Sequence, residues 1–163
     1  MANPALVRVV RYTSLLGSGL LAGVALTVLF LELALRDLTG PEYVRVRQAE
    51  YAPFTWFIGI LLVPTLVAVV ILVLRARTER SPELPRLAWA LGLLLVALAV
   101  SLVVNGPINM EQMDWSAQAP PGDWARVRDR WQIAHAVRTV ALVVAFGCVC
   151  VAALERPLRL VRR

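Results

Sequence analysis

Hydrophobic residues run in four long stretches along the chain, with short polar segments between them. A helix rises about 1.5 Å per residue, so about 20 apolar residues cross the hydrocarbon core of a bilayer. The stretches predict transmembrane helices over residues 12–35, 54–74, 87–104 and 136–154. The pattern therefore predicts an all-α fold, a four-transmembrane-helix bundle, with residues 1–163 forming a single integral membrane domain.

The first polar segment, residues 36–53, begins with a helix-start signature at Thr39-Gly40-Pro41. It predicts a short amphipathic helix over residues 41–52, which either lies along the membrane surface or caps the bundle. The two sides of this helix carry Tyr43, Arg47 and Glu50, and Val44, Gln48 and Tyr51, respectively.

The fourth helix is expected to be longer than its membrane span. Pro120-Pro121-Gly122 breaks the chain, and Asp123 is a good N-cap. Nothing after Trp124 interrupts a helix before Pro157, so an extended fourth helix of more than thirty residues is predicted. Its first third would stand outside the bilayer.

Two features mark the first span. Gly19 and Gly23 form a small-xxx-small pair, which allows close approach of another helix. Glu32 is a carboxylate one turn from the helix end, and an unpaired charge at this depth costs a few kcal/mol. Glu32 either sits in the interface or faces inward with a functional role.

Composition supports a membrane protein. Of 163 residues, 59% are hydrophobic, and the mean hydropathy of +0.68 is too high for a soluble domain of this length. The net charge of +6 comes from arginine alone, because the chain has no lysine. The arginines cluster at the ends of apolar stretches instead of forming a basic stripe with exposed aromatics, which argues against nucleic-acid binding.

The distribution of arginine predicts the orientation. Ten arginines lie in the N-terminal arm, the second turn and the C-terminal tail, whereas six lie in the first and third loops among seven acidic residues. The positive-inside rule then predicts a multi-pass protein of the cell membrane with both termini in the cytoplasm.

Candidate chemistry is concentrated in residues 105–138. Arg128, Trp131, His135 and Arg138 follow a helical spacing of i, i+3, i+7 and i+10, so they form one stripe on the fourth helix. Arg138 would lie below the interface and needs an acceptor. Glu32, at the same expected depth on the first helix, is the predicted partner.

Asn105 and Asn109 flank Gly106-Pro107 at the expected end of the third helix, where free carbonyls typically line a protein-filled or wet cavity. Together with the stripe, these residues predict a polar pocket at the outer mouth of the bundle, walled by Trp131 and either Tyr43 or Tyr51. Each residue also has a structural interpretation: a solvated histidine, an interfacial tryptophan anchor, or helix-capping asparagines.

A metal site made of His135 with Glu32, Glu50 or Glu111 is an alternative interpretation. The chain has only one histidine and no Glu-x-x-His motif, so neither a metal nor another cofactor is expected.

The motifs Asn105-x-Pro107-Ile108-Asn109 and Trp131-x-x-x-His135-x-x-Arg138-Thr139 resemble those of small four-helix membrane proteins of the anthrone oxygenase-like family. The segment PEYVRVRQAE, residues 41–50, resembles the short helix after the first span of that family. The resemblance implies oxidation of an anthrone to an anthraquinone without an evident cofactor.

If the activity transfers, His135 would be the general base. Arg138, Asn105 and Asn109 would stabilise an enolate oxygen, and Trp131 would stack on a flat substrate. The predicted catalytic residues are therefore His135, Arg138, Asn105 and Asn109, and the predicted substrate-binding residues are Trp131, Glu32, Tyr43 and Gln48. The role of Glu32 rests on its depth alone.

Other functions remain open at this point: a non-catalytic protein that binds a lipid or small molecule, a helper subunit of a larger membrane complex, or a transporter or channel. The expected partners are the lipid bilayer and a lipophilic small molecule, with a homo-oligomer left open.

Overall fold

The computed structural model describes residues 3–154, apart from the side chains of residues 52–55. In this part of the chain the secondary structure is entirely helical. The elements are α1 (Pro4–Ala34), the short 3-10 helix η1 (Leu35–Asp37), α2 (Gly40–Thr78), α3 (Leu84–Val100), the π-helical turn η2 (Ser101–Asn105), α4 (Gly106–Met113) and α5 (Trp124–Leu154).

Four of the described helical segments are long and apolar enough to cross a membrane: Pro4–Asp37, Trp56–Thr78, Leu84–Met113 and Trp124–Leu154. The predicted four-helix membrane bundle is thus confirmed. Large apolar side chains such as Phe30, Trp89 and Leu102 are exposed on its outside, as expected for a lipid-facing surface. The arginines of the C-terminal tail lie outside the described residues.

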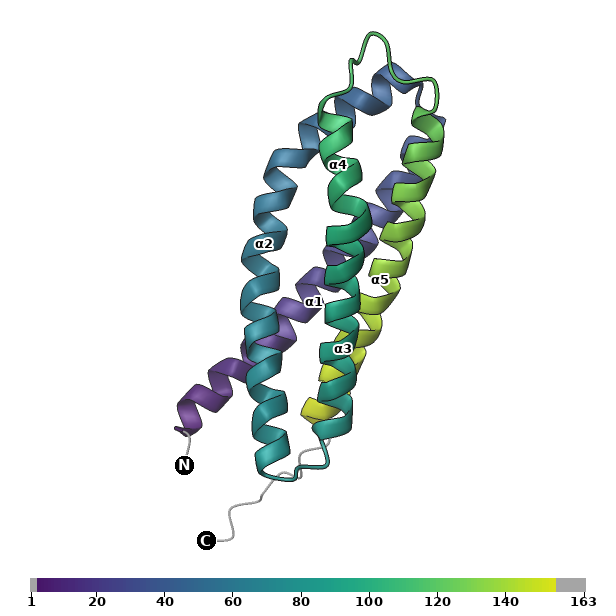
Figure 1. Ribbon diagram of the computed structural model, residues 1–163. Coiled ribbons are helices and arrows are strands. Elements are labelled where there is room, and N and C mark those ends of the chain that lie inside the picture. The colour runs from purple at the N-terminus through teal and green to yellow at the C-terminus, as the bar shows by residue number, and fades with distance from the viewer. Residues whose placement is uncertain (1–2, 155–163) are drawn as a thin grey trace, which may run out of the picture.

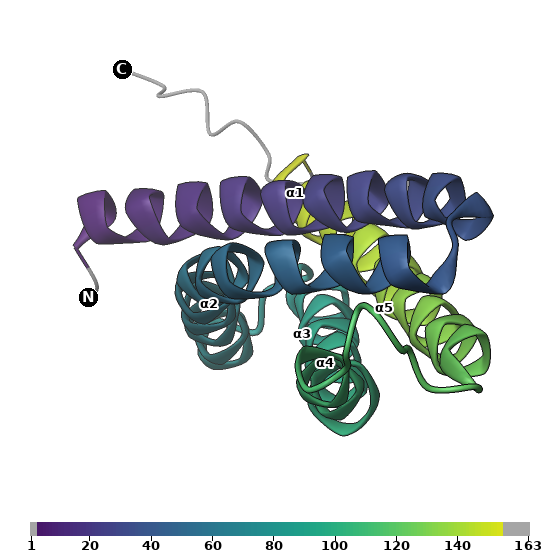
Figure 2. The same cartoon turned by 90° about the horizontal axis from the view of Figure 1, so that it is seen from above.

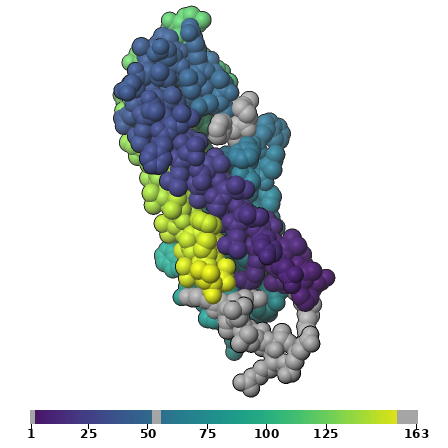
Figure 3. Space-filling model, turned by 180° about the vertical axis from the view of Figure 1, so that it is seen from behind, coloured from purple at the N-terminus to yellow at the C-terminus, as the bar shows by residue number. Residues whose placement is uncertain are grey.

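The helices form two layers (Figure 1). Seen from above, α2, α3 with α4, and α5 stand in a row, and α1 crosses one side of that row (Figure 2). Helix α1 contacts both α2 and α5, and in the view from behind it runs diagonally across the surface of the bundle (Figure 3). Buried leucine, valine and alanine side chains from all four helices make the main core.

The amphipathic helix predicted for residues 41–52 is the first part of α2, which continues without interruption to Thr78. A capping box starts it: the backbone N–H of Thr39 donates to the Glu42 carboxylate at 2.9 Å. This first part lies across one end of the bundle and then turns into the span (Figures 1 and 2). Tyr43 and Val44 are fully buried there, so the segment is a cap over the bundle. We call residues 40–51 the cap helix.

The third helix does not end at Asn105 as expected. Pro107 has no N–H, and the helix passes this point through the π-helical turn, in which the Gly106 N–H bonds to the Ser101 carbonyl five residues earlier. The wider turn lets α4 continue to Met113, so the whole segment from Leu84 forms one 30-residue helix. Such π-helical turns are frequent at functional sites.

The closest approach of α1 to its neighbours does not use the predicted Gly19 and Gly23 as a pair. A Cβ at Gly19 would lie 3.2 Å from the Phe146 ring on α5, a tight contact that a small shift of the ring relieves, and Gly23 has open space around it. Gly17 is the critical position, because a Cβ there would overlap the side chain of Thr65 on α2. Thr65 is fully buried and donates to the Leu61 carbonyl at 2.7 Å, so it has little room to move.

We therefore predict that Gly17→Val destabilises the bundle by about 1–3 kcal/mol through overpacking at Thr65. Gly23→Val, on the same helix, is the matched control and should change stability little. Thermal unfolding of both variants in detergent measures the difference. Equal effects of the two substitutions would contradict the α1–α2 packing described here.

Candidate functional site

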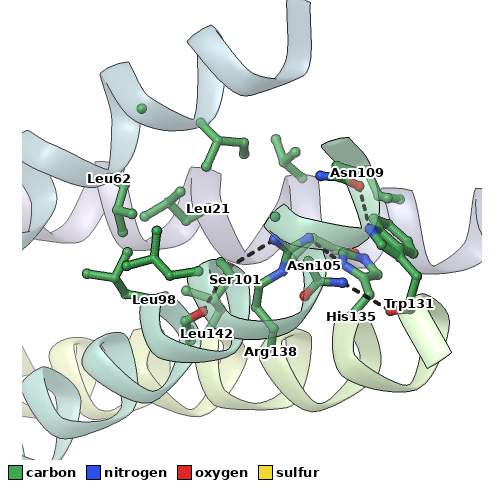
Figure 4. A pocket seen from close by; sticks show the side chains of 18 of the residues that line it. Leu21, Leu62, Leu98, Ser101, Asn105, Asn109, Trp131, His135, Arg138 and Leu142 are labelled. Carbon is green, nitrogen blue, oxygen red and sulfur yellow. Dashed lines mark hydrogen bonds between the residues drawn. The ribbon is translucent and has the colours of Figure 1, made fainter. Parts of the chain in front are cut away.

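A cavity of about 320 Å³ lies between the helices, and its lining includes Arg47, Glu50 and Tyr51 of the cap helix. Its volume is within the range of small-molecule sites. The polar residues of its wall gather at one end (Figure 4). They are Arg47, Glu50, Tyr51, Ser101, Asn105, Asn109, Trp131, His135 and Arg138. Aliphatic residues including Leu21, Leu62, Leu98 and Leu142 line the rest.

His135 is held by a hydrogen bond at each ring nitrogen, and it is only 1% exposed. Its Nε2 lies 3.0 Å from the Ala25 carbonyl oxygen on α1. A carbonyl can only accept, so Nε2 carries the hydrogen and donates. Its Nδ1 lies 2.5 Å from Nη2 of Arg138, which can only donate, so Nδ1 presents a lone pair. The contacts therefore fit a neutral imidazole with its basic nitrogen at Nδ1.

Arg138 is the second member of this pair. Its Nη1 donates to the Ser101 hydroxyl at 3.1 Å. Ser101 begins the π-helical turn, and its hydroxyl in turn donates to the Ala97 carbonyl at 2.8 Å. Figure 4 shows Arg138 reaching from α5 towards Ser101 and His135. The irregular turn therefore helps to fix the guanidinium in the cavity wall.

The predicted pairing of Glu32 with Arg138 is wrong. Glu32 is buried and instead accepts from Arg47 Nη1 at 2.9 Å. Gln132 donates to both the carbonyl and the carboxylate of Glu32, at 3.0 and 3.2 Å. Gln132 precedes Arg138 by six residues, or about 9 Å along a helix. Glu32 therefore lies at the level of the cap helix, above Arg138, and is not part of the cavity wall.

Arg47 connects the cap helix to the other helices. Besides Glu32, it contacts Glu50 at 3.4 Å, donates to Asn109 Oδ1 at 2.8 Å and to Gln112 Oε1 at 3.1 Å. Its guanidinium carbon lies 4.2 Å from the centroid of the Trp131 ring, which is a cation–π contact. Arg47 is not among the site residues predicted from the sequence. The sequence shows that Arg47 precedes Glu50 by three residues, but it does not show that the Arg47 side chain inserts between the helices.

Trp131 joins the two polar groups of the cavity. Its ring stacks on His135 with a centroid distance of 4.9 Å and an interplanar angle of 15°. Its Nε1 donates to Asn109 Oδ1 at 2.6 Å, and its carbonyl accepts from Asn105 Nδ2 at 3.1 Å. The two asparagines thus connect the third long helix to α5 through hydrogen bonds to Trp131. The Trp131 side chain is buried and faces the protein interior instead of lipid.

Tyr43 and Gln48 were expected to contact substrate, but neither lines the cavity. Tyr43 packs against Trp124 with ring centroids 5.6 Å apart, and burial raises the pKa of its phenol, which keeps it neutral. Gln48 donates to the Trp115 carbonyl at 2.8 Å and so fixes the start of the loop that follows α4. Tyr51, the alternative aromatic residue, does line the cavity.

Arg128, the first member of the predicted stripe, is also turned away from the cavity. Its Nη1 donates to the Arg36 carbonyl at 3.2 Å, and its guanidinium lies 5.1 Å from the Trp124 ring centroid. It therefore connects the start of α5 to η1, the short helix that follows α1.

Glu50 is the carboxylate that lines the cavity. Burial raises its pKa, and the neighbouring Arg47 partly opposes this shift. Among residues 3–154, no group of three histidine, cysteine or acidic residues is arranged to hold a metal ion. In particular, both nitrogens of His135 contact Ala25 and Arg138, not the glutamates considered from the sequence.

The fold and the cavity define a class: a four-helix, membrane-type bundle that encloses a largely aliphatic cavity with polar residues at one end. The sequence model of the anthrone oxygenase family matches residues 53–148. This match covers more than half of the 163 residues, so the chain belongs to the anthrone oxygenase family. Comparisons with curated proteins and with solved structures gave no significant match.

The matched segment contains Asn105, Asn109, Trp131, His135 and Arg138. It does not contain α1 or the cap helix, so Glu32 and Arg47 lie outside it. The resemblance expected for residues 41–50 is likewise outside the matched segment.

We predict that Arg47→Met destabilises the protein by about 3–5 kcal/mol, because it leaves the Glu32 carboxylate buried without its cation. Arg45→Met, an exposed arginine on the same cap helix, is the matched control. Unfolding in detergent followed by circular dichroism measures both. The double variant Glu32→Gln/Arg47→Met should recover part of the loss. A loss no larger than that of the control would contradict a stabilising ion pair.

Proposed function

We propose that this chain is a membrane-embedded oxygenase-type oxidoreductase that acts on a lipophilic, planar, anthrone-like substrate in the cavity. The observation that carries this proposal is the His135–Arg138 pair, which joins a basic nitrogen to a guanidinium in the wall of a largely aliphatic cavity. Both residues lie within the segment matched by the anthrone oxygenase family.

The proposed first step is proton abstraction. An anthrone has an acidic C–H next to a carbonyl-stabilised ring system. In our proposal the Arg138 guanidinium turns from His135 Nδ1 to the substrate carbonyl oxygen, which frees the Nδ1 lone pair to take the proton. The Nε2–H bond to Ala25 then becomes charge-assisted and supports the imidazolium.

The proposed roles of the surrounding residues follow from their contacts. Arg138, in a cavity of low polarity, would stabilise the enolate oxygen that develops. Asn109 and Asn105 would hold the Trp131 ring and its helix in place through their hydrogen bonds. Trp131, whose ring already stacks on His135 and lies under Arg47, would border the substrate at one end of the cavity.

The second step is the reaction of the resulting carbanion with O₂. The substrate supplies the electrons: oxygen adds to the carbon that lost its proton and gives a hydroperoxide. Loss of the second C–H proton and cleavage of the O–O bond then form the new carbonyl and release water. Overall, a ring CH₂ becomes C=O, O₂ is consumed and water is released. We propose that no cofactor or metal takes part, because the carbanion is electron-rich enough to react with O₂ directly.

We further propose that the protein lies in the cell membrane with both termini in the cytoplasm and the cap helix on the outer side. The excess of arginine in the N-terminal arm, the second turn and the tail supports this orientation. The substrate would then reach the cavity from the bilayer. Two residues of the cavity wall, Gly59 on α2 and Leu102 on the third helix, are exposed on the outside, which supports an opening between these helices.

A non-catalytic function as a lipid- or small-molecule-binding protein is the second candidate. One observation favours it: both nitrogens of His135 are already hydrogen-bonded to protein groups, so the histidine acts as a base only if Arg138 moves. In that case a planar ligand would bind in the cavity and leave unchanged.

We predict that the purified protein accelerates O₂ uptake by an anthrone and that His135→Ala lowers this rate about 100-fold or more, as expected for loss of a general base. An oxygen electrode and the absorbance of the quinone product measure the reaction, against empty micelles for spontaneous oxidation. Arg126→Gln, an exposed arginine on the same helix, is the control and should keep the wild-type rate.

Full activity of His135→Ala would rule out its proposed role. Tight binding of an anthraquinone by wild-type protein, without any acceleration of O₂ uptake, would favour the non-catalytic function.

A further inference from the structure

Arg138 carries a positive charge that has no carboxylate partner among the described residues. Its two hydrogen-bond partners are the Ser101 hydroxyl and the neutral His135 Nδ1. Its Nε is buried and has no hydrogen-bond partner at all. This guanidinium lies within the fourth membrane-type helix, where an unpaired charge is expensive.

Arg47, the other arginine of the cavity wall, has acidic partners that neutralise its charge. Arg47 has two carboxylates, Glu32 at 2.9 Å and Glu50 at 3.4 Å, and two amide acceptors, Asn109 and Gln112. Both carboxylates contact Arg47 and not Arg138. The Trp131 and His135 rings lie between the two arginines. The cavity therefore has a neutralised cation at one position and an uncompensated cation at another.

The neighbours of Arg138 in the cavity cannot supply the missing charge. Protonation of His135 would add a second positive charge beside it, and the other side chains labelled around Arg138 in Figure 4, Ser101, Asn105 and Leu142, are uncharged. The available source of negative charge is a molecule inside the cavity, which Arg138 lines directly.

We propose that the cavity takes its ligand as an anion, a planar aromatic acid whose ionised oxygen binds Arg138 and whose hydrocarbon part lies among Leu21, Leu62 and Leu98. The ionised group is a carboxylate or a phenolic hydroxyl acidified by conjugation with a ring carbonyl. This inference rests on the proposed function in so far as the same cavity holds the substrate, and it narrows the substrate class from flat and lipophilic to flat, lipophilic and acidic.

The hydrogen bond to the ligand, in which both donor and acceptor are charged, replaces the bond to His135 Nδ1, in which only the guanidinium is charged. The attraction between the two opposite charges is stronger in a cavity of low polarity. The ligand anion thus competes for the guanidinium and releases Nδ1, the nitrogen on which the proposed base chemistry depends.

The test compares two probes of nearly equal shape, anthracene-9-carboxylate and its uncharged analogue 9-anthracenemethanol, at neutral pH. Binding to the full-length protein in nanodiscs is followed by fluorescence anisotropy. We expect wild-type protein to bind the carboxylate about tenfold more tightly or better, which corresponds to about 1.4 kcal/mol. In Arg138→Gln the preference should fall to near unity, and in Arg138→Lys it should be kept in part.

Arg126→Gln is the matched control, because it removes the same charge from an exposed position on the same helix. It should keep the wild-type preference, which separates a specific site from general attraction to a basic protein. Thermal unfolding of each variant with and without probe adds a second reading: only proteins that keep a cation at position 138 should be stabilised more by the carboxylate than by the alcohol.

Equal affinity of wild-type protein for the two probes would overturn the inference, and so would a preference that survives Arg138→Gln. The proposed function is tested separately by O₂ uptake. Anion preference without O₂ uptake would support an anionic ligand and contradict the proposed oxygenase function. Turnover of an anthrone without anion preference would support the oxygenase function and contradict an anionic ligand.

Discussion

A guanidinium inside an apolar bundle needs an acceptor, and this constraint governs how the site is built. Arg47 meets it with Glu32 and Glu50, and the contact with Glu32 joins the cap helix to α1. Arg138 meets it only with the neutral groups of His135 and Ser101. The first arrangement fixes the bundle at its capped end. The second leaves a cation in the wall of a cavity of about 320 Å³ that can accept a ligand.

Each backbone irregularity near the site serves this arrangement. The π-helical turn carries the third helix past Pro107, so that Asn109 and Gln112 lie within reach of Arg47. The same turn begins at Ser101, whose hydroxyl holds Arg138. The change of direction in α2 allows one continuous helix to supply both the cap and the second span. A break at either position would separate the groups that line the cavity.

The elements that follow from local pattern could be predicted from the sequence. Hydropathy located the four spans, and the Pro-Pro-Gly break with Asp123 located the start of α5 at Trp124. Helical spacing placed Trp131, His135 and Arg138 on one face, where the structure finds them lining the cavity. The partner of Glu32 could not be predicted from the sequence. Glu32 lies at the level of Gln132, about 9 Å along the helix from Arg138. The residue pattern of one helix does not show which residues of another helix lie at the same depth. The inward position of Arg47 could not be predicted either, because it depends on how the cap helix packs against three other helices.

The central claim is that the His135–Arg138 pair is the part of the cavity that holds the ligand. An experimental structure of the protein in a nanodisc with a hydroxyanthraquinone tests it most directly. We expect a ligand ring beside Trp131, with a ligand oxygen bonded to Arg138 and the guanidinium withdrawn from His135 Nδ1. A ligand seated only on the lipid-facing surface, with Arg138 still bonded to His135 in an unchanged cavity, would contradict it.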